Sequence, residues 1–216
     1  MTSKISQPPL LLVTDRRQAL RPLQAVIAAA LNAGCRWVSL REKDLPADEQ
    51  ILMARSLLPL VRAQHGRLML HGEAVLARDA GIDGVHLPAG GDVAGARALI
   101  GPEKILGVSI HTVMEAERVD PACVDYALAG PAFETPSKPG YGPEIGRKGL
   151  ADIAQACRVP VLAIGGINAA RIAEVLAGGA AGVAVMGSVM RAADPAQEMR
   201  SLLASLNGAL AMRART

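Results

Sequence analysis

The stretch "VPVLAIGGINAARIAEVLAGGAAGVAVMGS", residues 159–188, decides the fold. Two apolar runs, 159–166 and 182–188, flank the segment 169–179, in which apolar residues recur at helical spacing. Each run is continuously apolar rather than alternating, which is typical of a strand buried on both faces of a parallel sheet. The stretch therefore predicts a strand, a helix and a second, parallel strand.

The same unit recurs along the whole chain of 216 residues. Eight apolar runs, each ending at a polar or glycine break, predict an α/β fold that closes into a single (β/α)8 TIM barrel occupying residues 1–216 as one domain. An open doubly wound sheet is the alternative, but no early G-x-G-x-x-G motif supports it. The predicted strands are 10–15, 37–42, 68–71, 84–87, 105–111, 126–133, 159–166 and 182–188, and the predicted helices are 22–34, 48–63, 72–81, 93–101 and 169–179.

Composition narrows the class of protein. The formal net charge is +3, aromatic residues make up 2%, and there is no basic run, so we do not expect a nucleic-acid partner. The apolar run near the N-terminus is too short for a signal peptide or a membrane helix, and no membrane partner is expected. Three widely spaced cysteines, Cys35, Cys123 and Cys157, suggest reduced thiols in a cytoplasmic protein.

The loops after the last two predicted strands are rich in glycine. Gly166 and Gly187 each precede a predicted helix. In TIM barrels the active site lies at the C-terminal ends of the strands, and these two loops frequently bind phosphate. Glycine lets the backbone approach an oxyanion, and helix N-termini supply free N–H groups. The loops therefore predict a phosphate site, although glycines that serve tight turns alone would look the same.

Cationic side chains at the same end predict a second anion site. Alternation along "LREK" (40–43) places Arg41 and Lys43 on one side of the chain and Glu42 on the other, and Lys138 follows the sixth strand. Cations that point into a barrel mouth are costly without an anion, whereas a solvated strand end with local ion pairs is the simpler alternative. Two anion sites at one mouth predict a pair of substrates, or one ligand with two phosphate-bearing ends.

With these motifs in order, residues 10–195 resemble the thiamine phosphate synthase and TenI family. Singly each motif is weak, but their order, spacing and position on the strands agree together. The motifs are "VTD" (13–15), "LREKD" (40–44), "AGIDGVHL" (80–87), "GVSIHT" (107–112), "DYALAGPAFETPSK" (125–138), "VPVLAIGGI" (159–167) and "GVAVMGS" (182–188).

The resemblance implies thiamine biosynthesis and a transferase that joins a pyrimidine methyl pyrophosphate to a thiazole phosphate and releases pyrophosphate. It implies a dissociative reaction, in which Lys138 is the expected catalytic residue because fixed cations stabilise the leaving charge. The positions matched to thiazole phosphate are Thr135, Ser137, Gly166, Met186 and Gly187, and those matched to pyrophosphate are Arg41, Lys43, Ser109 and Lys138.

The chain departs from the family at its magnesium ligands. The family has an Asn-Asp pair after the third strand, where this chain has His71 and Gly72. A second family Asp lies five residues after the histidine of the fourth strand, where this chain has Gly91, with Asp92 one residue late. Mg²⁺ prefers carboxylates together with substrate phosphates, so we expect weakened Mg²⁺ binding, with Asp92 as the remaining candidate ligand.

Other functions stay open from the sequence. A TenI-type thiazole tautomerase would fit "FET" and the altered metal corner, but its catalytic histidine is replaced by Pro131, so His71 would have to serve as the acid–base group. A non-catalytic or regulatory binder of thiazole phosphate or thiamine phosphate would keep the phosphate loops alone. His86 and His111 are expected to make structural hydrogen bonds. An oligomer is conceivable for a barrel of this type, but no motif specifies one.

Overall fold

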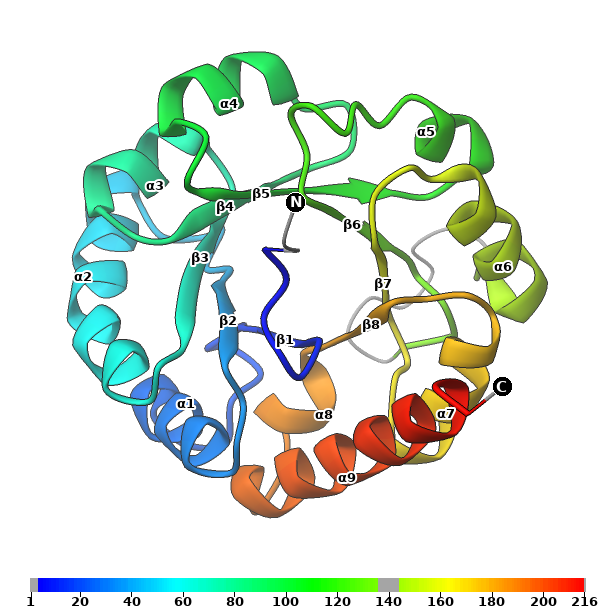
Figure 1. Ribbon diagram of the computed structural model, residues 1–216. Coiled ribbons are helices and arrows are strands. Elements are labelled where there is room, and N and C mark those ends of the chain that lie inside the picture. Colours follow the sequence, from blue (N-terminus) through cyan, green and yellow to red (C-terminus); the bar gives the residue numbers. More distant parts are fainter. Residues whose placement is uncertain (1–3, 136–143, 216) are drawn as a thin grey trace.

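The computed structural model describes residues 4–135 and 144–215. Eight parallel strands form a closed barrel in chain order, and β8 pairs with β1 to complete it (Figure 1). This confirms the predicted (β/α)8 TIM barrel. The strands are β1 (Leu10–Val13), β2 (Trp37–Leu40), β3 (Arg67–His71), β4 (Gly84–Leu87), β5 (Ile105–Ile110), β6 (Tyr126–Ala129), β7 (Val161–Ile164) and β8 (Gly182–Val185).

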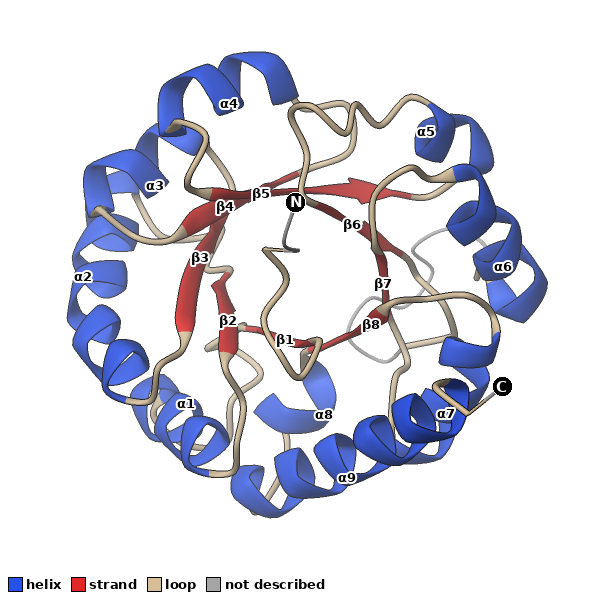
Figure 2. Ribbon diagram, in the orientation of Figure 1, coloured by secondary structure: helices blue, strands red, loops and turns tan. Residues whose placement is uncertain are grey.

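Helices surround the strands as an outer ring (Figure 2). Their apolar residues face inward at helical spacing, as in α9, where Met199, Leu202, Leu203 and Leu206 are buried. No helix among the described residues is long and apolar enough to cross a membrane. The helices are α1 (Leu23–Asn32), α2 (Ala47–Ala63), α3 (Ala74–Ala80), α4 (Val93–Ile100), α5 (Val113–Glu117), α6 (Gly146–Ala156), the short 3-10 helix η1 (Ala169–Arg171), α7 (Ile172–Ala177), α8 (Gly187–Met190) and α9 (Pro195–Arg213).

Some elements differ from the sequence predictions. β6 ends at Ala129 rather than at residue 133, because Pro131 has no N–H to donate to a neighbouring strand. α6 begins inside the segment 134–149, which the sequence predicted to be irregular. The helix that the sequence predicted after the eighth strand, without bounds, is present as α9, and Asp194 accepts hydrogen bonds from two N–H groups of its first turn.

The barrel interior is a packed core, and its N-terminal end is closed. Trp37 and Tyr126 are fully buried and meet edge to face at 4.7 Å between ring centroids. Gly107 makes room for them, since a Cβ there would lie 2.2 Å from the Tyr126 ring. Ile5 packs against this cluster, and the N-terminal segment crosses the middle of the barrel (Figure 1). The open end of the barrel is therefore the opposite one, at the C-terminal ends of the strands.

Candidate active site

A cavity of about 530 Å³ lies at the C-terminal ends of the strands. It brings together most of the residues that the sequence singled out, although they come from β3, from β5 and from the loops after β2, β6, β7 and β8. Ser137 and Lys138 lie outside the described residues. The predicted site residues that line the cavity are Arg41, Lys43, His71, Ser109, Thr135, Gly166, Met186 and Gly187.

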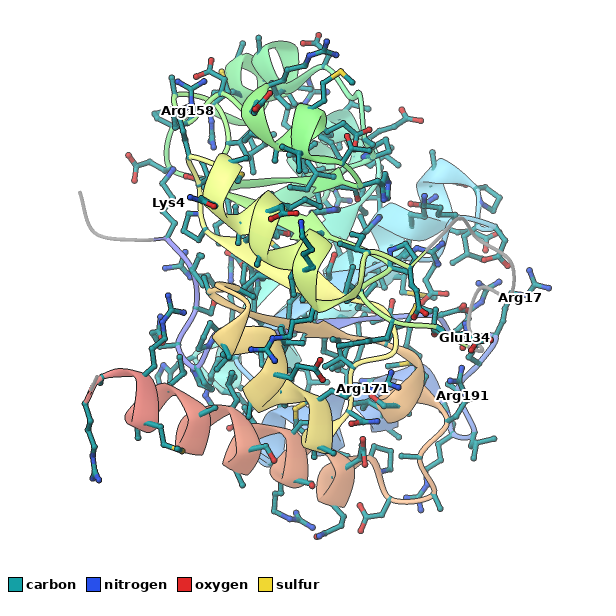
Figure 3. The ribbon with its side chains drawn as sticks, turned by 90° about the vertical axis from the view of Figure 1, so that its right-hand side faces the viewer. Lys4, Arg17, Glu134, Arg158, Arg171 and Arg191 are labelled. Carbon is teal, nitrogen blue, oxygen red and sulfur yellow. The ribbon has the colours of Figure 1, made fainter. Side chains whose placement is uncertain are left out.

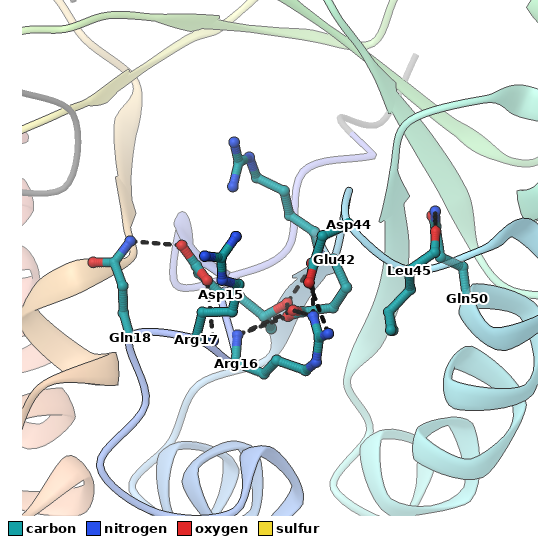
Figure 4. A network of polar contacts seen from close by, with 10 residues as sticks. Asp15, Arg16, Arg17, Gln18, Glu42, Asp44, Leu45 and Gln50 are labelled. Carbon is teal, nitrogen blue, oxygen red and sulfur yellow. Dashed lines mark hydrogen bonds and ion pairs between the residues drawn. The ribbon is translucent and has the colours of Figure 1, made fainter.

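Hydrogen bonds to Glu42 hold the loop after β2, which carries the cations Arg41 and Lys43. Glu42 is 2% exposed and accepts a hydrogen bond from the Thr14 hydroxyl at 2.6 Å and from the Arg16 backbone N–H at 3.0 Å. The Arg16 guanidinium bonds both Glu42, at 3.2 Å, and Asp44, at 2.7 and 2.8 Å (Figure 4). The Thr14 hydroxyl accepts the backbone N–H of Arg41 at 2.9 Å. The network therefore holds the start of the loop after β2 in one conformation.

The predicted alternation along this loop is confirmed. Arg41 and Lys43 line the cavity, whereas Glu42 is engaged with Arg16 on the other side. Burial lowers the pKa of the Lys43 ammonium, and the nearby Arg41 charge lowers it further. No carboxylate lies within 4.0 Å of either head group among the residues that the structure describes. An anion in the cavity would therefore be the partner that compensates these charges.

The loop after β7 approaches its neighbours so closely that only glycine fits. Gly165 and Gly166 have φ values of +102° and +63°, in the left-handed region. A Cβ on Gly166 would lie 2.5 Å from the carbonyl oxygen of Glu134, and one on Gly165 would lie 2.9 Å from the Cα of Pro131. The loop thus packs directly on the segment after β6, which also places Thr135 at the cavity.

The loop after β8 completes this wall. Met186 and Gly187 line the cavity, and α8 begins at Gly187. The Ser188 hydroxyl is buried at the same wall and has no hydrogen-bond partner within residues 4–135 and 144–215. The two glycine loops therefore bring backbone close to the cavity, as the sequence predicted for a phosphate site, and the Ser188 hydroxyl lies buried in the same wall.

The sequence analysis missed two arginines beside these loops. The guanidinium of Arg171 donates to the Gly166 carbonyl at 3.0 Å and lies 4.4 Å from the centroid of the Phe133 ring. Arg191 follows α8 and donates to the side chain of Gln18. Both line the cavity. Their position in the sequence, about one helical turn after Gly166 and Gly187, could have identified Arg171 and Arg191 as neighbours of the phosphate loops.

The side view shows where these groups lie along the barrel. Glu134, Arg171 and Arg191 gather at one end of the molecule, and Lys4 and Arg158 lie at the other (Figure 3). Of the residues that line the cavity, the positively charged ones come from several loops, and Glu134 supplies a carboxylate. The excess of positive charge at this end suits a phosphorylated ligand.

The histidines differ in their surroundings. His71, at the end of β3, is 9% exposed and lines the cavity, and its ring lies 4.5 Å from that of His86. His86 is fully buried, and burial lowers its pKa to about 3, with a further contribution from Lys43, so its ring is neutral. The Nδ1 atom of His111 lies 2.5 Å from the carbonyl oxygen of Gly130. His86 makes hydrogen bonds to the hydroxyls of Tyr126 and Ser109, so the hydrogen bonds expected of His86 and His111 are present.

The donor set does not match the magnesium site of the family. Gly72 and Gly91 stand at its two carboxylate positions. Asp92 is exposed, caps α4 through a hydrogen bond from the N–H of Gly95 at 2.8 Å, and is not among the residues that line the cavity. The described part of the chain contains no group of three or more His, Cys, Asp or Glu side chains suited to a metal. The described residues therefore do not form a magnesium site of the family's kind.

A TIM barrel with two cationic groups and two glycine loops at one mouth defines a barrel enzyme that acts on phosphorylated small molecules. Comparison with known proteins identifies the family. Residues 10–189 match the family model described as thiamine monophosphate synthase (TMP-TENI). The chain belongs to this family.

Relatives and solved structures agree with this assignment. A thiamine-phosphate synthase of Roseiflexus sp. (strain RS-1) is 44% identical over 207 residues, which cover 94% of this chain and 87% of the relative. A putative thiamine-phosphate synthase of Geobacter sulfurreducens is 42% identical and covers 91% of this chain and 93% of its own. The structure of a thiamine phosphate pyrophosphorylase from Pyrococcus furiosus superimposes with a TM-score of 0.83 at 31% identity, over 93% of this chain and 96% of the other.

Proposed function

We propose that this chain is a thiamine-phosphate synthase, a transferase of thiamine biosynthesis. Its substrates are a pyrimidine methyl pyrophosphate and a thiazole phosphate, and it releases pyrophosphate. One observation supports the proposal beyond the family assignment. A single cavity of about 530 Å³ is lined both by Arg41, Lys43 and Ser109 and by the loops of Gly166 and Gly187, which supports one anion site for each phosphorylated substrate.

The reaction breaks one bond and forms another. The C–O bond between the pyrimidine methylene and pyrophosphate breaks, and its electron pair leaves with pyrophosphate. The thiazole nitrogen then donates its lone pair to the methylene carbon, which forms the new C–N bond. Arg41 and Lys43 stabilise the charge that develops on the leaving pyrophosphate, and the Glu42 network keeps them in place without reorganisation. Lys138 is proposed to contribute a third charge from the loop after β6.

The other group of residues orients the acceptor. The glycine loops, together with Thr135 and Ser137, are proposed to hold the phosphate of the thiazole and so to aim its nitrogen at the methylene carbon. Arg171 lies beside this group and is held by Gly166 and Phe133. Orientation of two bound reactants contributes much of the rate in such a reaction.

A direct assay tests the proposal. Purified protein is incubated with both substrates, with and without Mg²⁺, and thiamine phosphate is measured. We expect product, and we expect Arg41→Ala to lower kcat/KM at least 100-fold while Arg158→Ala, exposed at the other end of the barrel, changes it less than twofold. Absence of product at every Mg²⁺ concentration would refute the synthase activity.

The position of His71 favours a second candidate, the thiazole tautomerase. His71 lines the cavity and can transfer a proton, whereas Pro131, at the position of the tautomerase histidine, cannot. An isomerisation assay with the thiazole carboxylate phosphate tests this function. Equal rates for His71→Ala and the parent would exclude His71 as the acid–base group. Binding of thiazole phosphate without turnover in either assay would instead indicate a non-catalytic binder.

We propose three further properties of the protein. The described cysteines Cys35, Cys123 and Cys157 are free thiols, in line with the reducing compartment expected of a cytoplasmic enzyme. We propose that residues 1–216 act as one domain. An oligomer stays a prediction, and size-exclusion chromatography with light scattering measures it directly.

A further inference from the structure

A chain of hydrogen bonds runs from the barrel interior to the cavity. The hydroxyl of Tyr126 lies 3.1 Å from Nδ1 of His86, and Nε2 of His86 lies 2.9 Å from Oγ of Ser109. Tyr126 and His86 are fully buried, and Ser109 lines the cavity. Of the three side chains in this hydrogen-bonded series, Ser109 is therefore the one that a ligand in the cavity can contact.

The tyrosine at the buried end determines which atom donates in each of these hydrogen bonds. Burial raises the pKa of the Tyr126 hydroxyl, so it keeps its proton. Within residues 4–135 and 144–215, His86 Nδ1 is the hydrogen-bond partner recorded for this hydroxyl, and a buried donor without an acceptor is costly. Tyr126 therefore donates to Nδ1. The neutral His86 ring then carries its own proton on Nε2 and donates to Ser109 Oγ.

The geometry points to a positioning role for two residues beneath the cavity. We propose that Tyr126 and His86 fix one histidine tautomer, and that this tautomer compels the Ser109 hydroxyl to donate its hydrogen bond to an anion in the cavity. Because Oγ already accepts from Nε2, its hydrogen must point elsewhere, and the cavity is the open side. That the anion is the pyrophosphate of the substrate rests on the proposed function.

The opposite tautomer would work against the site. With the proton on Nδ1, Ser109 would donate to Nε2 and turn only lone pairs toward the anion, which repels it. Packing restrains the rings that set the direction, since His71 lies 4.5 Å from His86 and Trp37 lies 4.7 Å from Tyr126 between centroids. The arrangement is thus prepared before a ligand arrives.

Nitrogen NMR of the unliganded, full-length protein tests the direction without any substrate. Labelling of the histidine rings with ¹⁵N distinguishes protonated from unprotonated nitrogen, and His86→Gln identifies the signal that belongs to His86. We expect Nε2 to be protonated and Nδ1 to be unprotonated at pH 7. A proton on Nδ1, or a doubly protonated ring, overturns the proposal whether or not the protein is a synthase.

Calorimetry with inorganic pyrophosphate tests the consequence. We expect Ser109→Ala to weaken binding about tenfold, and Tyr126→Phe to weaken it about threefold or more, because each removes or misdirects one hydrogen bond to an anion. If Tyr126 acts through Ser109, the double variant binds no more weakly than Ser109→Ala. Additive losses overturn the proposal. Failure of the parent to bind pyrophosphate counts against the proposed function, and the NMR result then decides the relay alone.

A pair of amide variants separates positioning from packing. His86→Gln places an amide donor near the position of Nε2, whereas His86→Asn places it near Nδ1 and leaves Ser109 without a donor. We expect Gln to retain pyrophosphate affinity within about threefold and Asn to lose about tenfold, with circular dichroism confirming that both fold. Equal losses in two folded variants would contradict the positioning role. If either variant fails to fold, the double-variant cycle with Tyr126→Phe carries the same test.

Discussion

Glu42 is the residue on which the shape of the pyrophosphate side of the cavity depends. It is 2% exposed, yet it carries a charge and accepts from the Thr14 hydroxyl, the Arg16 N–H and the Arg16 guanidinium. The substitution Glu42→Gln keeps the size of the side chain but turns one acceptor oxygen into a donor. That donor must face Arg16 or Thr14, both of which already donate.

The expected loss of stability follows from these contacts. A hydrogen bond to a charged group contributes about 1.5–3 kcal/mol, and removing one partner of a buried pair costs about 3–5 kcal/mol. The Arg16 side chain is 31% exposed and keeps its bonds to Asp44, so the cost of leaving it without Glu42 lies toward the lower of these two ranges. We expect Glu42→Gln to lower the free energy of unfolding by about 2–4 kcal/mol, and Tm by about 4–16 °C for a chain of this size.

Urea unfolding followed by circular dichroism measures this change, and Asp44→Asn is the matched control. Asp44 bonds the same guanidinium, but its side chain is 39% exposed, so solvent screens the ion pair and we expect a much smaller loss than for Glu42→Gln. We also expect Glu42→Gln to raise the KM for the pyrimidine pyrophosphate, because the loop that carries Arg41 and Lys43 loses its anchor. Similar losses for the two variants, or a loss below about 1 kcal/mol for Glu42→Gln, would refute the reasoning.

Three further predictions follow from the site. The pKa of Lys43 lies below its usual 10.5, so its positive charge is lost at a lower pH than that of an ordinary lysine. Pyrophosphate affinity, measured by calorimetry between pH 7 and 10, should therefore fall as pH rises through this pKa. Lys43→Arg should abolish the fall, because arginine keeps its charge over this range. Gly166→Ala should raise the KM for thiazole phosphate at least tenfold, because its Cβ would meet a carbonyl at 2.5 Å, whereas Gly81→Ala, with a similar φ of +70° and open space, should cost only about 1–2 kcal/mol of stability and leave KM unchanged. Burial raises the pKa of the Cys35 thiol to about 11, so mass spectrometry should find Cys35 unalkylated at pH 8 until urea unfolds the chain; rapid alkylation in the folded state would contradict its burial.

Much of the site was predictable because it follows from strand position. In a closed parallel barrel the end of every strand reaches the same mouth, so an apolar run followed by a polar residue already places that residue. Arg41 and Lys43 were assigned in this way and Ser109 by the family resemblance, and the three residues share one cavity. Arg171 and Arg191 could not be assigned so, because they lie in or after helices, where the side chain's direction depends on how the helix packs.

The sequence by itself determined the parallel α/β architecture of this protein, since continuous apolar runs are buried on both faces of a parallel sheet, and their number of eight favours the closed barrel. Tertiary structure decided how each polar group is used. Glu42 and Asp92 are both carboxylates near the mouth, but one accepts hydrogen bonds from Thr14 and Arg16 in the interior, and the other caps an exposed helix. His86 is neutral because burial removes it from water, and its bond to Tyr126 depends on Gly107 leaving space for that ring. Such roles depend on distances between residues far apart in the chain, which a linear pattern does not contain.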